Sequence, residues 1–301
     1  MSEQPQGMPN FVRLLEELAP EEGIFPAPID KLVTFRVTHT YGCKPQVYEP
    51  GFIFGAQGKK HIHLEGRQYN YSAGNFMAVF APMPFECEVI EASPDKPLLG
   101  MAILLDSNRL TKLLLKMDRG EAPPAKSGSG NVSGIVSGPI NAQLMDAVIR
   151  LLTCLKDPAE AAVLGDAIID EIYFRIISHE RGGALATMLQ QRGQIQQISK
   201  AVDHVHRNLD KPVAVEELAA IVNMSASGFH KKFKEVMHLS PLQYAKSIKL
   251  NRAQSYILEG RSVSEAGAMV GYNSMAQFSR EYKRHFGMPP SEHARSPEAV
   301  M

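Results

Sequence analysis

The chain has 301 residues, and at roughly 150 residues per domain this length predicts two folded units. Hydrophobic residues make up 44% of it and charged residues 21%, which excludes a disordered protein. The longest apolar run, residues 101–105, is far shorter than the roughly 20 residues that cross a bilayer, so no membrane partner is expected. Because the N-terminus MSEQPQGMPN has no visible secretion signal and the three cysteines (Cys43, Cys87 and Cys154) are widely spaced, we expect a cytoplasmic protein.

The charges divide unevenly along the chain, although the net charge is zero. Residues 1–190 carry 17 Lys and Arg against 22 Asp and Glu, whereas residues 191–301 carry 15 against 10. Phosphate contacts need positive side chains, so the C-terminal third is where a polyanion is expected to bind.

The N-terminal third consists of short stretches rich in Val, Phe, Tyr and Ile, separated by turn residues such as Glu49-Pro50-Gly51 and Ala73-Gly74. Short strands at this spacing indicate a barrel or a sandwich, and not alternating strands and helices. The eight expected strands are residues 32–37, 46–48, 52–56, 61–64, 68–71, 76–80, 86–91 and 98–105.

After these strands the pattern becomes helical. Asp106 or Ser107 can cap a short helix to about Met117, and residues 120–139, rich in Gly, Ser and Pro, predict a loop. Two amphipathic helices within residues 140–180 then either cover the β domain or pair with a second chain to form a homodimer. Their expected buried positions are Leu144, Val148, Leu151, Leu152 and Leu155, and then Leu164, Ile168, Ile172, Tyr173 and Ile176.

The last hundred residues contain an internal repeat at an offset of 49 residues. Each copy predicts a helix, a tight turn and a second helix, which Ser225 caps in copy one and Ser274 in copy two. Gly271 suits a turn that needs positive φ, so the pattern is a helix-turn-helix, twice. The matched residues are Glu216, Ala219, Ser225, Phe229, Lys234 and Pro241 in copy one and Glu265, Ala268, Ser274, Phe278, Lys283 and Pro290 in copy two.

The second helix of each copy has two faces. Phe229 and Phe233 in copy one, like Phe278 and Tyr282 in copy two, are four residues apart and are expected to be buried. Outward Arg and Gln side chains suit hydrogen bonds to base edges in a major groove, and each such contact contributes about 1–3 kcal/mol of discrimination between bases. The alternative is that these are ordinary solvated faces of a helical domain. The outward stripes are Ser227, His230, Lys231 and Lys234, and Ala276, Gln277, Arg280 and Arg284.

A single helix over residues 242–258 is expected between the two copies, with Leu242, Tyr244, Ile248, Leu250, Ala253 and Ile257 buried. At about 1.5 Å per residue this rod is about 25 Å long. It could set two recognition helices roughly one DNA turn apart, near 34 Å, with modest DNA bending.

The run AGAMVGYNSMAQFSREYKRHFGMPPSEHAR, residues 266–295, closely resembles the signature of the AraC/XylS family of bacterial transcriptional regulators. Copy one, with MSASGFHKKFKEVMHLSP, is similar to the family's first helix-turn-helix, and the resemblance covers residues 195–295. The N-terminal half, with YEPGFIFGAQGKK, YNYSAGNFM and PMPFECEV, is similar to the cupin-like sensor domain of one subgroup.

This resemblance implies base contacts from Ser227, His230 and Lys231 in copy one. In copy two it implies base contacts from Met275, Ala276, Gln277 and Arg280, whereas phosphate contacts are expected from Ser225, Lys234, Ser274, Lys283 and Arg284. Ser227-Gly228 departs from the larger side chains usual in the family, and Gly costs about 1 kcal/mol of helix propensity. Copy one is therefore expected to read few bases, and copy two to carry more of the discrimination.

The pair His61-Ile62-His63 invites a metal interpretation, because alternation along a strand places both rings on one face. The glutamate that cupin metalloenzymes place four or five residues later is replaced by Arg67 and Gln68, and Cys87 stands where a further His is expected. Two His and a Cys could hold a soft metal, but the favoured expectation is no metal, no cofactor and no catalytic machinery.

We therefore expect an α+β multidomain protein with a cupin-like β-barrel sensor and dimerisation domain over residues 1–181, a linker over 182–193 and a double helix-turn-helix domain over 194–301. It would regulate transcription by binding double-stranded DNA, either activating by contact with RNA polymerase or repressing. A small-molecule effector would bind in the barrel, near Arg36, His39, Tyr48, Tyr69, Phe85 and Cys87. The alternatives are a metal enzyme or metal sensor using His61 and His63, and a helical protein-interaction module without DNA affinity.

Overall fold

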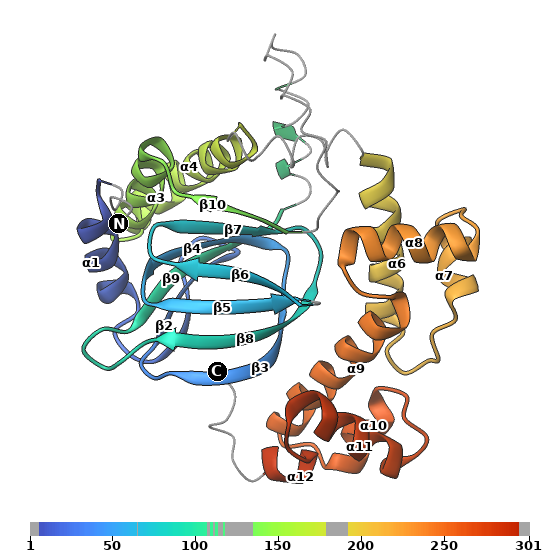
Figure 1. Ribbon diagram of the computed structural model, residues 1–301. Coiled ribbons are helices and arrows are strands. Elements are labelled where there is room, and N and C mark those ends of the chain that lie inside the picture. Colours follow the sequence, from blue (N-terminus) through green and yellow to red (C-terminus); the bar gives the residue numbers. More distant parts are fainter. Residues whose placement is uncertain are drawn as a thin grey trace.

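The computed structural model describes residues 6–64, 66–106, 135–178 and 192–294, together with residues 109, 110, 112, 113 and 117. Two antiparallel sheets with flanking helices form the N-terminal domain, and residues 192–294 form an all-helical domain beside them (Figure 1). The expected α+β class with a β-rich first half and a helical second half is confirmed.

The first sheet has six strands in the order β1-β2-β9-β4-β7-β10. All of its pairs are antiparallel. Two strands were missed: β1 precedes the first expected strand, and β10 lies in the stretch expected to be a loop. The bounds are β1 Gly23–Pro26, β2 Leu32–Val37, β4 Gly51–Gln57, β7 Asn75–Val79, β9 Leu98–Leu104 and β10 Ile135–Pro139.

The second sheet has four strands in the order β3-β8-β5-β6, also antiparallel. The two sheets face each other, but no strand pairing among the described residues joins them into a ring. The expected closed barrel is therefore corrected to an open pair of sheets. The bounds are β3 Tyr41–Tyr48, β5 Lys59–Leu64, β6 Arg67–Ser72 and β8 Met83–Glu91.

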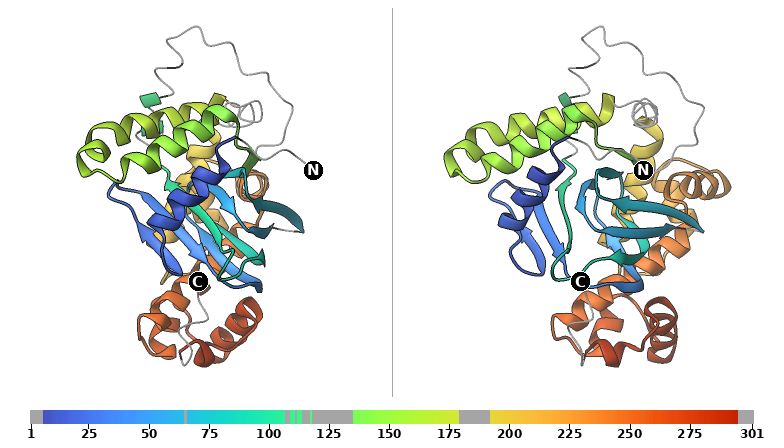
Figure 2. Two further views of the ribbon diagram at one scale, coloured as in Figure 1. Left: turned by 90° about the vertical axis from the view of Figure 1, so that its left-hand side faces the viewer. Right: turned by 60° about the vertical axis from the view of Figure 1, so that its left-hand side comes forward.

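Three helices cover the outer face of the six-stranded sheet (Figures 1 and 2). The sequence prediction missed α1, Met8–Leu18, which buries Phe11, Leu14 and Leu15. The two expected amphipathic helices are α3, Ala142–Cys154, and α4, Pro158–Ser178. Their predicted stripes are buried except for Leu164, which is 46% exposed because the buried side of α4 begins at Ala161 and Gly165 instead.

Asp106 caps a helical segment as expected: its side chain accepts a hydrogen bond from the Arg109 amide at 3.0 Å. Ser107, the alternative cap, lies outside the described residues, as does most of the expected loop 120–139. The expected linker 182–193 also lies outside them, except for its last two residues, which already belong to a helix.

The C-terminal domain contains two helix-turn-helix units joined by a long helix (Figure 1). That helix, α9, begins at Pro241 with a capping box from Ser240 and Gln243. Its predicted buried positions hold except for Leu242, which is 54% exposed. The bounds are α6 Arg192–Arg207, α7 Val215–Ile221, α8 Ala226–Met237, α9 Pro241–Leu258, α10 Val263–Met269, α11 Met275–Phe286 and α12 Pro290–His293.

Among the described residues, no helix is both long enough and apolar enough to span a lipid bilayer.

Candidate nucleic-acid interface and interdomain cavity

The second helix of each unit, α8 or α11, begins at the predicted serine. The Ser225 hydroxyl oxygen accepts a hydrogen bond from the Gly228 amide at 3.2 Å, and that of Ser274 accepts from the Gln277 amide at 3.3 Å. Each cap pairs one of the orphan amides of the first helical turn. Both helices therefore start where the sequence pattern placed them.

The aromatic pair on each of these helices is buried. Phe229 and Phe233 have ring centroids 5.5 Å apart, as have Phe278 and Tyr282, and all four side chains have zero exposure. Burying two aromatic rings on one side fixes the rotation of the helix about its axis, because they pack against the unit's own core. The opposite side of each helix must then face solvent.

That opposite side carries the predicted contact residues, and all of them are exposed. Within the described part of the chain, the cations of Lys231, Lys234 and Arg284 have no carboxylate partner. The guanidinium of Arg280 donates only to the Ala276 carbonyl, at 3.3 Å. In contrast, Gln277 is partly engaged, because its amide donates to Glu281 at 3.3 Å.

The repeat is not in one register throughout. At the predicted offset of 49, Ala219 should match Ala268, but Ala219 is buried and Ala268 is exposed. The first helices superpose at an offset of 48 instead: Val222 and Val270 are both buried and both follow the last helical residue. The turn of copy two is therefore one residue longer, and the identities at 49 in the first helix are coincidental.

Glycine is required in the turn of copy two. Gly271 has a φ of 80°, and a Cβ there would lie 2.3 Å from the carbonyl oxygen of Asp210. The matching residue of copy one, Asn223, also has positive φ, at 54°, which asparagine tolerates better than most residues. The same turn geometry is thus reached with two different residues.

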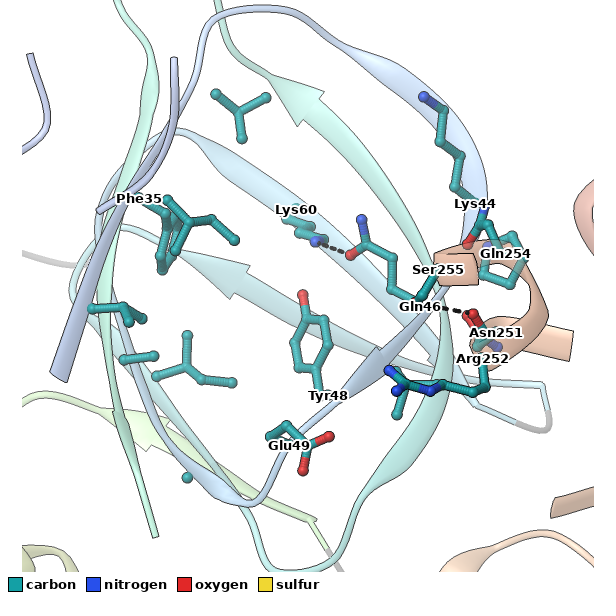
Figure 3. Close-up of a pocket in the computed structure, with 18 of the residues that line it drawn as sticks. Phe35, Lys44, Gln46, Tyr48, Glu49, Lys60, Asn251, Arg252, Gln254 and Ser255 are labelled. Carbon is teal, nitrogen blue, oxygen red and sulfur yellow. Dashed lines mark hydrogen bonds between the residues drawn. The ribbon is translucent and has the colours of Figure 1, made fainter. Parts of the chain in front are cut away.

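A cavity of about 860 Å³ lies between the two domains. One side is formed by β2, β3 and neighbouring strands, and the other by α6, α9 and the segment after α11 (Figure 3). Apolar residues including Phe35, Val47 and Ile53 form much of its wall. Its cationic side chains include Lys44, Lys60 and Arg252, whereas the guanidinium of Arg36 donates to the Ala19 carbonyl at the end of α1, at 3.3 Å.

Lys60 is the most unusual of these cations because only 8% of it is exposed. Its ammonium group donates to the Gln46 side chain at 2.8 Å and lies 5.2 Å from the centre of the Tyr48 ring (Figure 3). It has no carboxylate partner among the described residues. The Tyr71 hydroxyl, in the wall of the same cavity, also lacks a hydrogen-bond partner there. Burial raises the pKa of Tyr48 and of Tyr71 well above its usual value, so both phenols remain neutral.

Of the expected effector-pocket residues, Arg36 and Tyr48 line this cavity. Phe85 and Cys87 lie behind Tyr48: the Phe85 ring packs edge-on against it at 5.2 Å, and the Cys87 sulfur lies 3.8 Å from its hydroxyl. The other two are not in the wall. His39 pairs with Glu22 at 2.8 Å on the surface, and Tyr69 lies on β6.

The structure places the three candidate metal ligands, His61, His63 and Cys87, on two different faces of the four-stranded sheet. Cys87 pairs with Ile62 across β8 and β5, and its fully buried side chain points between the sheets. His61 and His63 alternate with Ile62 and therefore point to the other face, where each lies 3.9 Å from a Glu88 oxygen. A site built from His61, His63 and Cys87 is excluded by this alternation.

Comparison with known families agrees with this geometry. Residues 28–184, more than half of the chain, match the sequence model for the AraC-type transcriptional regulator N-terminus, and residues 218–296 match that of a helix-turn-helix domain. The chain belongs to the AraC family of transcriptional regulators.

Relatives within the AraC family are regulators of bacterial genes. GbdR, an HTH-type transcriptional regulator of Pseudomonas aeruginosa, is 28% identical over 149 residues, which are 49% of this chain and 40% of GbdR. The lactose operon transcription activator of Staphylococcus xylosus is 31% identical over 97 residues, 32% of this chain and 35% of that protein. In these alignments the chain spans well under two thirds of either relative.

Solved structures share the fold of this AraC-family chain over nearly its whole length. Apo ToxT of Vibrio cholerae superposes with a TM-score of 0.60 at 9% identity, covering 90% of this chain and 99% of ToxT. ToxT with a bound unsaturated fatty acid superposes with a TM-score of 0.58 at 10% identity, covering 88% and 93%. The arrangement of a two-sheet domain beside two helix-turn-helix units is therefore common to both proteins.

Sequence reasoning missed several cavity residues of this AraC-family chain. Lys60 is far in sequence from Arg252, and although Lys60 ends the family-like stretch YEPGFIFGAQGKK, nothing in that stretch indicates a cavity. The available signal was strand alternation. On β5, Lys60 falls on the same face as the apolar Ile62, whereas Lys59 and His61 fall on the other face, and this pattern indicates a buried lysine.

Proposed function

We propose that the protein is a sequence-specific regulator of transcription that binds double-stranded DNA through α8 and α11. The observation that carries this proposal is the two-sided construction of both helices. Each buries an aromatic pair on one side and presents unpaired cations on the other, which suits entry into a major groove. The connecting helix α9 has 18 residues and is about 27 Å long at about 1.5 Å per residue, which supports contact with two successive grooves.

Base contacts are assigned to Ser227, His230 and Lys231 on α8 and to Met275, Ala276, Gln277 and Arg280 on α11. Arg280 is the strongest of these because a guanidinium can bind guanine in bidentate fashion. Gln277 has to release Glu281 before it can pair with a base. Copy one, with its short Ser227-Gly228 segment, contributes mainly phosphate contacts.

Phosphate contacts are assigned to Ser225 and Lys234 in copy one and to Ser274, Lys283 and Arg284 in copy two. Each capping serine uses its oxygen to accept an amide hydrogen, so its hydroxyl hydrogen can donate to a phosphate oxygen, in the case of Ser225 in place of the 3.5 Å contact with the Ser227 hydroxyl. The lysines and Arg284 follow later on the exposed sides of the helices, where they can reach the DNA backbone.

A salt titration of binding to duplex DNA tests this function. With several phosphate contacts, the logarithm of the binding constant should fall steeply and linearly with the logarithm of salt concentration, by about 0.9 per contact. Lys234→Gln and Lys283→Gln should each reduce that slope by about one. A flat salt dependence, or no binding at low salt, would favour a protein-interaction module instead.

The effector proposed for the cavity is a small anionic molecule with an apolar body. Lys60 is buried without a carboxylate partner, and burial of an unpaired charge is costly, so an anionic group of the ligand beside it would compensate. The Tyr71 hydroxyl can donate to the same group. ToxT, which shares the fold, has been solved with an unsaturated fatty acid, which supports this chemical class.

Binding of cis-9-hexadecenoate, measured by calorimetry, tests this effector class. The acid should bind, the corresponding alcohol should bind at least tenfold more weakly, and Lys60→Met should lose the difference. Lys59→Met is the matched control, because Lys59 is the neighbouring lysine on the opposite face of β5. Equal binding of acid and alcohol, or an unchanged preference in Lys60→Met, would contradict the role of Lys60.

Because the cavity is lined by both domains, a bound effector can change how they sit relative to one another. Regulation through this cavity would not depend on residues 182–193 alone. An activating role is supported by the relative named as the lactose operon transcription activator, and contact with RNA polymerase is proposed as its route. A reporter assay with and without the effector determines the sign.

We also propose a homodimer through α4. Val163 and Phe174 are 75% and 44% exposed, and they lie eleven residues apart, three helical turns along one side. Between them on this side lie the exposed Ala167 and the half-buried Asp170, which pairs with Arg109. The apolar surface that we propose to meet a second copy therefore consists of Val163, Ala167 and Phe174. Phe174→Glu should shift sedimentation from dimer to monomer, and a wild-type monomer at micromolar concentration would contradict the proposal.

A further inference from the structure

The outer face of the four-stranded sheet brings together a thiol, an imidazole and a carboxylate. Cys43 on β3, His63 on β5 and Glu88 on β8 each offer one ligand atom, and these atoms lie within 4.8 Å of one another. The three residues come from three adjacent strands. This face is separate from the interdomain cavity, which is lined from the other face of β3 and β5 by side chains such as Lys44 and Lys60.

Strand pairing explains how the three residues meet. On β5, His61 is opposite Glu88 and His63 is opposite Glu86, so these side chains share the outer face. On β3 the pairing with β8 shifts between Tyr41 and Lys44. A bulge of this kind changes the direction of side chains, and here it leaves Cys43 exposed on the side of Glu88.

The Nε2 atom of His63 is buried at this place, yet it has no hydrogen-bond partner among the described residues. The nearest Glu88 oxygen is 3.9 Å away, too far for a hydrogen bond. The same oxygen is also 3.9 Å from Nδ1 of His61. Two imidazoles therefore surround one carboxylate oxygen without contacting it, which leaves room for a cation between them.

We propose that Cys43, His63 and Glu88 bind a divalent transition-metal ion of borderline softness, such as Zn²⁺, on the outer face of the sensor domain. Ligand atoms around a tetrahedral Zn²⁺ lie about 3.3–3.8 Å apart, given bond lengths of about 2.0–2.3 Å. The present spacing of up to 4.8 Å closes to that value with a movement of about 1 Å of partly exposed side chains. His61 or a water molecule supplies the fourth ligand.

The donor set selects the metal. A sulfur and a nitrogen ligand disfavour Mg²⁺ and Ca²⁺, which prefer oxygen, and favour Zn²⁺ and its neighbours in the first transition series. A role for Cys43 as a nucleophile fits less well. Burial and the nearby carboxylates of Glu88 and Glu86 raise the pKa of its thiol, whereas an activated cysteine needs a lowered pKa.

Titration with Co²⁺ in place of Zn²⁺ tests the site with a spectroscopic signal. Full-length protein should bind one equivalent of Co²⁺, with a thiolate charge-transfer band in the near ultraviolet and the visible bands of tetrahedral cobalt, and Zn²⁺ should displace it. Cys43→Ser should abolish the charge-transfer band. His63→Gln should weaken Co²⁺ binding at least tenfold and reduce the visible bands.

Two control variants carry the same residue types elsewhere. Cys154→Ala removes a buried thiol at the end of α3, and His39→Gln removes an exposed histidine, and both should bind Co²⁺ as the wild type does. Thermal unfolding without metal checks that each variant is folded, and Cys43 is exposed, so serine fits its place. Absence of the bands in the wild type, or their persistence in Cys43→Ser, would overturn the proposal.

Discussion

The two helix-turn-helix units carry the same local pattern but belong to different cores. The buried aromatics of copy one, Phe229 and Phe233, lie in one hydrophobic cluster with inner residues of the sensor sheets such as Phe85 and Val89. The buried aromatics of copy two, Phe278 and Tyr282, form a separate small cluster with residues of α9 and α10. The core of copy one is therefore part of a larger cluster that continues into the sensor sheets, whereas the core of copy two is small and separate.

The two units also differ at their turns and helix ends. Copy two uses glycine at both left-handed positions, Gly271 in the turn and Gly287 after α11. Copy one uses Asn223 and His238 there. A unit with a small core of its own depends more on each of these local features, and this contrast leads to four predictions.

The largest effect is expected from Gly271→Ala. The added Cβ would be 2.3 Å from the Asp210 carbonyl oxygen, and the residue would also be strained at φ 80°, so the free energy of unfolding should fall by about 3–4 kcal/mol. Gly287→Ala is the matched control, because its φ of 78° is nearly the same but nothing lies within 4 Å of the Cβ that would be added, and it should lose only about 1–2 kcal/mol. Equal losses in urea unfolding would show that the close contact is not important.

Copy two should also be sensitive to acid. Burial, with a smaller effect of Lys246, lowers the pKa of His285 to about 4, whereas the unfolded value is 6.5. The unfolded state then binds more protons between these values, so stability is complete above pH 6.5 and is lost as the pH falls towards 4. At about 1.4 kcal/mol per pKa unit the loss approaches 3 kcal/mol.

His285→Gln should reduce this slope when urea unfolding is measured from pH 7 to pH 4.5. Some slope should remain, because burial also lowers the pKa of His206, which bonds to Tyr244 beside copy one at 2.9 Å. The matching position of copy one, Val236, does not titrate. An unchanged slope in His285→Gln would mean that His285 is solvated and charges freely.

Substitutions that test how DNA contacts are divided between the two copies should have a smaller effect. Arg280→Ala should cost about 1–3 kcal/mol on the specific site and much less on random DNA, because it removes a base contact. Lys231→Ala should cost less binding free energy on the specific site, and its losses on specific and on random DNA should differ less. Fluorescence anisotropy at one salt concentration measures both, on a site first identified by sequencing protected genomic fragments. Equal loss on both DNAs from Arg280→Ala would contradict its assignment.

The smallest effect is expected from His238→Gly at the end of α8. Its φ of 58° suits glycine, which occupies the matching position in copy two, so stability should rise by up to about 1 kcal/mol. The gain in stability should be smaller than at a fully exposed helix end, because the His238 ring is half-buried and its contacts would be lost. A destabilised His238→Gly in urea unfolding would show that those contacts outweigh the backbone strain.

Local physics explains what the sequence predicted well. The serine caps, the aromatic pairs four residues apart and Gly271 each act within one helical turn, so the two recognition helices could be placed directly. Strand alternation likewise placed His61 and His63 on one face of β5. In contrast, α1 was not predicted, although Met8, Phe11 and Leu15 have helical spacing.

Features that depend on distant residues could not be predicted in this way. The open pair of sheets depends on which strands pair at their edges, and β10 pairs with β7 across a gap of more than fifty residues despite its Gly138 and Pro139. The cavity joins Lys60 to Arg252, and the bulge at Cys43 is visible only once β3 and β8 are paired. The repeat offset was wrong in the first helix because two chance identities outweighed the burial pattern.

A hydroxyl-radical footprint of the full-length protein on its specific site tests most directly whether α8 and α11 enter the same side of the duplex. We expect two protected segments on one face of the DNA, with centres about 10–10.5 base pairs apart. A single protected segment, or two segments on opposite faces, would contradict the account.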